Sequence, residues 1–88
     1  MVNYKIVYSI QAQKDAKKLK KNSLKDKALV ILRILENDPF QTPPRYESLI
    51  GDLKGCYSRR INIQHRMVYE VFEEEKVVRV LKMWTHYE

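Results

Sequence analysis

The sequence predicts an α+β domain in the order β-α-α-β-β-β, with an antiparallel helical hairpin on one face of a mostly antiparallel, twisted sheet. Two segments of the first half carry apolar residues at helical spacing, and three segments of the second half are rich in strand formers. Short polar links separate those last three segments, which favours an antiparallel meander. With 88 residues the chain can build one hydrophobic core, so residues 1–88 are expected to form a single domain.

The chain begins with a predicted strand and a predicted helix. Residues 2–8 alternate, with two tyrosines and an isoleucine on one face, and are rich in residues that favour strands. Ser9 is a suitable N-cap for a helix over residues 10–21. That helix has a narrow apolar face and an outer face of lysines. We expect the lysine face to be solvated and to add non-specific attraction for phosphate.

A second helix is predicted after the break at Asn22 and Ser23. Ser23 and Asp26 have the spacing of a capping box, with Asp in place of the usual Glu. The apolar residues that follow have the spacing of one face of an amphipathic helix. They are Leu24, Ala28, Ile31, Leu32 and Leu35. The helix is expected to end at about Asn37, before Pro39.

The second half of the chain is predicted to form the sheet. A loop over residues 38–46 contains all three prolines, and residues 47–55 continue irregularly or as a short turn. Strands are expected at about 56–62, 65–73 and 76–84. Two helices are enough to cover one face of such a sheet. The other face is therefore open to a ligand.

Composition narrows the class of partner. Lys and Arg total 17 against 11 Asp and Glu, a formal net charge of +6, which suggests a nucleic acid or an acidic protein as partner. Cys56 is the only cysteine, which excludes an internal disulfide and a thiolate cluster; we expect it to be buried. The two histidines match no metal-binding spacing, so neither a metal nor another cofactor is expected.

Two further patterns bear on location. The longest apolar run, residues 28–32, is too short to cross a bilayer. The N-terminus lacks the basic-then-apolar pattern of a signal peptide. A cytoplasmic protein without a membrane partner is therefore the expectation.

Three arginines on or beside predicted strands are the most informative residues. Guanidinium is rarely buried without a partner, and its planar fork of donors matches phosphate geometry. If the hairpin turns on Ile63 and Gln64, alternation places Arg59 on the same face as Arg66. A turn one residue longer selects Arg60 instead. The sequence leaves both registers open.

A carboxylate, an imidazole and an arginine are sufficient to cleave RNA without a metal. A base removes the proton of the ribose 2′-hydroxyl, and the oxygen attacks the adjacent phosphate. An acid then protonates the leaving 5′-oxygen, and arginine stabilises the charge of the transition state. The chain offers Glu47, Arg66 and His86 for these roles. Composition alone, however, favours a basic binding module over a ribonuclease.

Four motifs resemble the YoeB/Txe branch of the RelE toxin superfamily, whose fold is of the microbial-RNase type. The resemblance covers about half of the chain, from Glu47 to Tyr87. Its segments are Tyr-Glu-Ser-Leu at 46–49, Leu-Lys-Gly-Cys-Tyr-Ser-Arg-Arg-Ile at 53–61, His-Arg-Met-Val-Tyr at 65–69 and Thr-His-Tyr at 85–87. The first half of the chain matches in layout only.

The resemblance implies a bacterial toxin of a type II toxin–antitoxin pair that enters the ribosomal A site and cuts mRNA there. Carried over by position, Glu47 is the general base, His86 the general acid, Arg66 the phosphate-stabilising group and Tyr87 a positioning residue. Four further side chains are expected to contact RNA, namely Lys54, Arg59, Arg60 and His65.

The chain also departs from the family pattern at two positions. Ile50 stands where a lysine is often found, and Gln64 where a glutamate is often found. Lys54 is a candidate replacement for the first lost charge. The principal acid, base and arginine are kept.

The resemblance implies several partners. They are an antitoxin of the YefM type with a flexible acidic tail, the ribosome with its rRNA and mRNA, and a second copy of the chain in a homodimer or a toxin–antitoxin hetero-oligomer. Two other functions remain open, because a fold does not determine a function. One is a non-enzymatic inhibitor of DNA gyrase, as in the ParE branch. The other is a basic RNA-binding module without catalysis.

Overall fold

The computed structural model describes residues 3–43, 45–48, 55–63 and 65–86, with the backbone alone for residues 85 and 86. The elements are β1 (Lys5–Tyr8), α1 (Ile10–Lys21), α2 (Lys25–Asn37), β2 (Tyr46–Ser48), β3 (Cys56–Arg60), β4 (His65–Phe72) and β5 (Val77–His86). The α+β class and the order of the predicted elements are confirmed. β2 is an additional strand, at the junction of the predicted loop over residues 38–46 and the stretch over 47–55 that was expected to be irregular or a turn.

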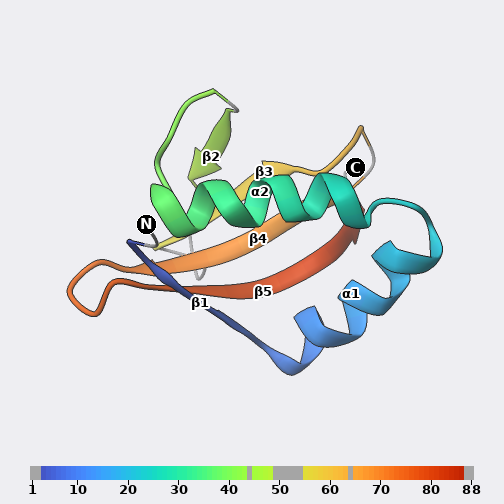
Figure 1. Ribbon diagram of the computed structural model, residues 1–88, viewed down its shortest axis with the longest axis horizontal. Helices are drawn as coiled ribbons and strands as arrows, with labels where there is room; N and C mark the ends of the chain where they lie inside the picture. The colour runs from blue at the N-terminus through green and yellow to red at the C-terminus, as the bar shows by residue number, and fades with distance from the viewer. Residues whose placement is uncertain (1–2, 44, 49–54, 64, 87–88) are drawn as a thin grey trace.

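The five strands form one sheet in the order β1-β5-β4-β3-β2. β1 runs parallel to β5, and every other neighbouring pair is antiparallel. β5 therefore lies between the first strand and β4, as Figure 1 shows. This order places the first and last strands side by side and leaves β2 at the far edge.

The two helices are joined by a tight link. Ser9 caps α1 as predicted, because its Oγ accepts the Ala12 N–H at 3.0 Å. The predicted capping box at Ser23 is wrong: Leu24 occupies the N-cap of α2, and Ser23 has a φ of 60°. The Leu24 N–H donates to the Leu19 carbonyl at 2.9 Å, so Ser23 ends α1 in a left-handed conformation instead of starting α2.

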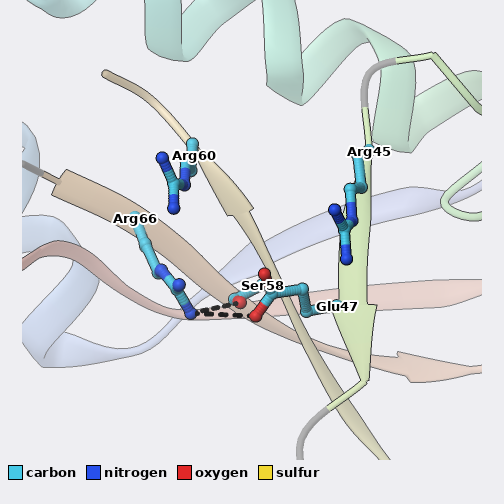
Figure 2. A pocket seen from close by; sticks show the side chains of 5 residues that line it. All are labelled: Arg45, Glu47, Ser58, Arg60 and Arg66. Atoms are coloured by element: carbon cyan, nitrogen blue, oxygen red, sulfur yellow. Dashed lines mark hydrogen bonds and ion pairs between the residues drawn. The ribbon is translucent and has the colours of Figure 1, made fainter. Parts of the chain in front are cut away.

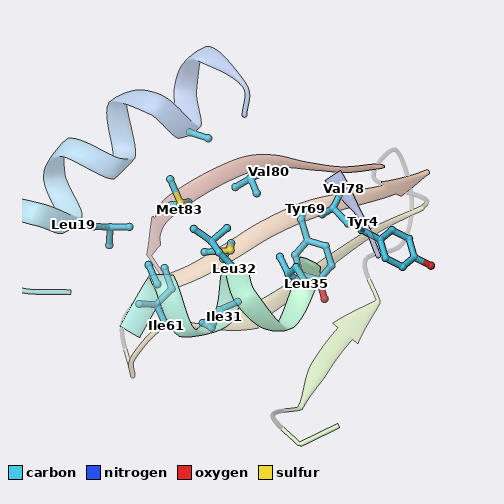
Figure 3. Packing of buried hydrophobic residues seen from close by; sticks show 13 residues of the cluster. Tyr4, Leu19, Ile31, Leu32, Leu35, Ile61, Tyr69, Val78, Val80 and Met83 are labelled. Carbon is cyan, nitrogen blue, oxygen red and sulfur yellow. The ribbon is translucent and has the colours of Figure 1, made fainter. Parts of the chain in front are cut away.

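Both helices pack on the same face of the sheet and form the core with β4 and β5 (Figure 3). The larger side chains of this core are Tyr4, Leu19, Ile31, Leu32, Leu35, Ile61, Met67, Tyr69, Val78, Val80 and Met83. Burial of each stabilises the fold by roughly 1.5–3 kcal/mol before entropy is counted. Cys56 is buried, as predicted. No helix within the described residues is long and apolar enough to span a membrane.

The alternation of β3 separates its side chains between the two faces. Tyr57 pairs with Tyr69 and Arg59 with Met67, so Tyr57 and Arg59 share the helix-covered face. Ser58 and Arg60 point to the opposite face. Glu47 of β2 pairs with Ser58, and it therefore lies on that second face as well. The side chains available for a site are gathered there.

Candidate active site

Three neighbouring strands present polar side chains on the open face of the sheet, at the end where β4 begins. Glu47 comes from β2, Ser58 and Arg60 from β3, and Arg66 from β4 (Figure 2). Directly paired residues of adjacent strands share a face and lie about 4.5–5.5 Å apart at Cβ. The register of β2, β3 and β4 therefore brings these four side chains together.

Arg66 is at the centre of this group. Its Nη1 donates to the Glu47 Oε2 at 3.3 Å and to the Ser58 Oγ at 3.4 Å. The Arg66 side chain is 15% exposed and that of Glu47 is 43% exposed. The ion pair thus joins a largely enclosed guanidinium to a carboxylate that solvent, or a substrate, can reach. Two of the predicted catalytic residues, Glu47 and Arg66, are in direct contact.

A pocket of about 200 Å³ surrounds this contact. Arg45, Glu47, Ser58, Arg60 and Arg66 line it. Three guanidinium groups face a single carboxylate there, so the pocket is positively charged and suits an anion. Its volume is below the roughly 300–1,000 Å³ of sites that enclose a drug-sized ligand. It is better matched to one phosphodiester group than to a whole nucleotide.

Arg45 is a member of this pocket that the sequence analysis missed. It lies in the proline-rich segment immediately before β2, two positions before Glu47. In an extended chain, residues i and i+2 face the same side. That spacing from Glu47 was the available signal, and Arg45 was not singled out because residues 38–46 were predicted to be a loop with an extended section.

The hairpin between β3 and β4 decides which arginine joins the site. Arg60 pairs with Arg66, so the longer of the two predicted turns is present. The Ile61 N–H donates to the His65 carbonyl at 2.8 Å, and the His65 N–H donates to the Asn62 Oδ1 at 2.7 Å. The Asn62 side chain thereby closes a turn of this length. Arg60 is exposed and lines the pocket, and its contact with RNA stays a prediction.

The predicted contact of Arg59 with RNA is wrong. Arg59 is only 1% exposed and lies on the helix-covered face. Its Nε donates to the Tyr69 hydroxyl at 3.0 Å, its Nη2 donates to the Pro39 carbonyl at 2.9 Å, and its guanidinium lies 5.0 Å from the centre of the Tyr46 ring. Burial raises the pKa of Tyr69, and the nearby Arg59 charge opposes that rise. Arg59 ties the proline-rich loop to the sheet.

The predicted contact of His65 with RNA is wrong for a similar reason. His65 is 4% exposed, and its ring stacks on Trp84 with centroids 3.9 Å apart and an interplanar angle of 24°. A buried ring in that arrangement packs β4 against β5. The alternation of β4 explains why His65 is buried, because its side chain lies on the same face as those of Met67 and Tyr69.

The other predicted site residues are described in part or not at all. His86 ends β5, and its backbone pairs with His65 while Thr85 pairs with Arg66. The end of β5 is therefore beside the strand that carries Arg66. The side chain of His86 lies outside the described residues, as do Lys54 and Tyr87. Ile50 and Gln64, the two departures from the family pattern, also lie outside them.

Among the described residues, no three histidine, cysteine or carboxylate side chains lie close enough together to hold a metal ion. The chemistry that the pocket offers directly is that of guanidinium groups, a carboxylate and a hydroxyl. Such a set can bind a phosphate, stabilise extra charge on it and accept a proton.

Comparison with known proteins identifies the family. Residues 8–87 match the family described as the YoeB-like toxin of bacterial type II toxin–antitoxin systems. Toxin YoeB of Mycobacterium bovis is 42% identical over 53 residues, and the alignment spans 60% of this chain and 60% of that relative. The YoeB/ParE toxin from Agrobacterium tumefaciens has a TM-score of 0.85 at 28% identity, with 94% of this chain and 99% of that chain covered. For the YoeB–YefM complex from Staphylococcus aureus the TM-score is 0.79 at 32% identity, with 96% and 98% covered.

The family match extends over nearly the whole chain, including both helices, for which the sequence resemblance was one of layout only. It includes every residue of the pocket around Arg66. The chain belongs to the family of YoeB-like toxins of bacterial type II toxin–antitoxin systems.

Proposed function

We propose that the protein is a metal-independent endoribonuclease that cuts mRNA in the ribosomal A site and so inhibits translation. The observation that carries the proposal is the contact of Arg66 with Glu47 and Ser58 inside a pocket with two further arginines. Family membership supports the same reading. The pocket fits one phosphodiester group, which is the group that such a reaction must hold.

The reaction assigns one role to each side chain. Glu47 accepts the proton of the ribose 2′-hydroxyl, and the 2′-oxygen then attacks the adjacent phosphorus. Arg66 stabilises the additional charge on the phosphate oxygens. His86 protonates the leaving 5′-oxygen, and Tyr87 positions the substrate. The bond from phosphorus to the 5′-oxygen breaks, which leaves a 2′,3′-cyclic phosphate on one product and a 5′-hydroxyl on the other.

The expected rate enhancements of these groups are large enough for an enzyme that acts only within a pre-organised complex. Each proton-transfer group contributes about 10²–10⁴-fold, and one pre-organised donor to a developing charge contributes about 10²–10³-fold. In the free protein Glu47 holds the Arg66 guanidinium in place. A bound phosphate becomes a new acceptor for Arg66, which releases Glu47 to act as a base.

Arg45 and Arg60, which line the same pocket, contact the phosphates next to the scissile group. Lys54 is proposed as a further contact by its position in the family motif. The net charge of +6 adds a long-range attraction for rRNA and mRNA. The site of action is the cytoplasm, where these partners are.

The partner that restrains the toxin is proposed to be an antitoxin of the YefM type. The Staphylococcus aureus relative is a YoeB–YefM complex, and its toxin chain matches this one over nearly its whole length. A disordered acidic tail that folds over the positive pocket can compete directly with RNA. The toxin–antitoxin hetero-oligomer is then the resting form.

The test is cleavage of a defined mRNA on purified ribosomes, with the new 5′ ends mapped. Wild-type protein is expected to cut in the A site, and Glu47→Gln, Arg66→Ala and His86→Gln are each expected to lose at least about 100-fold in rate. Arg33→Gln is the matched control, because it removes an exposed guanidinium on α2, outside the pocket. Full activity of the His86 and Glu47 variants contradicts the mechanism.

Two other outcomes identify the alternatives. Intact translation with a DNA damage response in cells indicates a gyrase inhibitor of the ParE kind. Salt-dependent binding to ribosomes without a cut product indicates a binding module.

A further inference from the structure

The last strand is irregular just before the residues that approach Arg66. Tyr69 pairs with Val80 and Arg66 pairs with Thr85, so β4 advances three residues (66 to 69) while β5 advances five (80 to 85). β5 therefore holds two extra residues in this stretch, in two separate register shifts. Bulges of this kind re-aim a strand and are frequent beside active sites.

The outer edge of β5 changes partner at the same place. β1 pairs with β5 only as far as Tyr8 opposite Val80. Beyond Val80 the chain of β1 has turned into α1, while β5 continues to His86. Backbone groups on this edge need partners from another element, because a buried N–H or C=O without one costs free energy.

Two side chains supply those partners, Ser9 at the N-cap of α1 and Asp15 near its middle. The Ser9 Oγ donates to the Leu81 carbonyl at 2.8 Å, at the first register shift. The Asp15 Oδ2 accepts the Met83 N–H at 2.9 Å and the Trp84 N–H at 3.2 Å, at the second. Figure 1 shows α1 beside this half of β5. The helix thus replaces β1 along the irregular part of the strand.

Asp15 is unusual for a carboxylate. It is 2% exposed, and its other oxygen, Oδ1, accepts the Gln11 amide at 2.9 Å. Both oxygens are therefore engaged inside the protein. Burial of a carboxylate is unfavourable unless hydrogen bonds compensate for the lost water. A single buried carboxylate oxygen thus accepts both N–H groups beside the bulge, while the other oxygen is held by Gln11.

We propose that Asp15 is a positioning residue of the active site, which sets the register of the end of β5 against Arg66. The inference rests on the proposed function for its catalytic consequence. Loss of one extra residue from β5 shifts Thr85 and His86 by roughly 3.3 Å along the strand and exchanges their faces. Loss of both shifts them by roughly twice that distance. Either change removes the proposed general acid from its place.

The experiment compares two substitutions of Asp15. Asp15→Ala removes the acceptor for both backbone N–H groups, and the single-turnover cleavage rate on ribosomes is expected to fall about 100-fold with KM unchanged. Asp15→Asn keeps one carbonyl oxygen for the two N–H groups, and rotation of the Gln11 amide accommodates the new NH₂. That variant is expected to stay within about threefold of the wild type, since the geometry is kept. Asp26→Ala, the loss of an exposed carboxylate on α2, is the control.

A second measurement is independent of activity. In the wild type, amide exchange is expected to be slow at Met83 and Trp84, and cross-strand proton contacts are expected between Arg66 and Thr85. Asp15→Ala is expected to lose both. If that variant does not fold, Asp15→Glu serves instead, because the longer side chain displaces the same acceptor.

The outcomes separate the two proposals. A folded Asp15→Ala protein that keeps the Arg66–Thr85 contacts overturns the positioning role, whatever its activity. Unchanged cleavage by Asp15→Ala overturns it as well. Wild-type protein that does not cut, combined with loss of the contacts in Asp15→Ala, overturns the proposed function and supports the structural role of Asp15.

Discussion

Arg59 and Arg60 are neighbours in β3, and the two faces of the sheet give them opposite roles. Arg59 is buried under the proline-rich loop, where it donates to the neutral oxygens of Tyr69 and Pro39. Arg60 is exposed at the rim of a pocket that it shares with Arg45 and Arg66. One guanidinium is buried within the fold, and the other is exposed and lines the pocket. The residue type alone does not distinguish them; the register does.

The largest effect is expected on the open face, from Arg66→Ala. The rate of ribosome-dependent cleavage should fall by about 10²–10³-fold, equivalent to about 2.7–4 kcal/mol of transition-state stabilisation. The free energy of unfolding should change by less than about 1 kcal/mol, since the ion pair with Glu47 is partly exposed. Rates per folded molecule and urea denaturation measure the two quantities. A large loss of stability with normal cleavage by the folded fraction would assign Arg66 to the fold.

The next effect is expected on the covered face, from Arg59→Met. Methionine fills much of the same volume but removes the Arg59 donors to the Tyr69 and Pro39 oxygens, and only the Tyr69 hydroxyl, at 3.2 Å, still donates to the Pro39 carbonyl. We expect the free energy of unfolding to fall by about 2–3 kcal/mol. Urea denaturation measures it, with Arg60→Met as the matched control, which should stay within about 0.5 kcal/mol of the wild type. Equal losses from the two variants would contradict the assignment of faces.

A smaller effect is expected from Arg60→Ala. Removal of one phosphate contact at the rim should weaken binding to RNA by several-fold and reduce the salt slope of log K by about one. Stability should be unaffected. Titration of a short RNA at several salt concentrations measures this, and Arg59→Met provides the comparison from the covered face. A salt slope unchanged by Arg60→Ala would remove Arg60 from the phosphate-binding set.

The smallest effect is expected on the pH dependence of stability, from Tyr69→Phe. Burial raises the pKa of Tyr69 above its ordinary value of 10.0 in the folded protein. The unfolded chain then loses the proton first, so this group's contribution to stability is complete below about pH 10 and declines as the pH rises further. Tyr69→Phe should flatten that decline. Thermal unfolding at several pH values between about 8 and 11, on either side of the ordinary tyrosine pKa, measures this decline in stability. The same decline in Tyr69→Phe as in the wild type would contradict the prediction.

Much of the fold followed from local patterns, and its exceptions have local causes. The helices were predicted because their apolar residues repeat at helical spacing over three turns or more. β2 was missed because a three-residue edge strand after prolines has too few positions to show alternation. Ser23 was misread because a serine before a helix also suits the left-handed end of the preceding one.

The site was predictable in its residue types more than in its geometry. Glu47 and Arg66 came from the motifs, but the choice between Arg59 and Arg60 depended on the Asn62 side chain that closes the turn. His65 was misassigned because its stacking on Trp84 arises between two strands whose register is irregular. Asp15 did carry a signal. It stands at helical spacing from Ala12 and Leu19, on the face that is buried.

The position of β5 in the sheet has a consequence for the folding of the chain during its synthesis. β5 is the last strand to be made, yet it lies between β1 and β4 and supplies the neighbour on which β1 depends. In a nascent chain that stops before Val77, β1 therefore lacks the strand with which it pairs. Such a chain also lacks the segment that carries His86. Contacts between such distant parts of a chain form late in folding. The sheet, and with it the stretch of β5 beside Arg66, is therefore completed only after the final strand has been made.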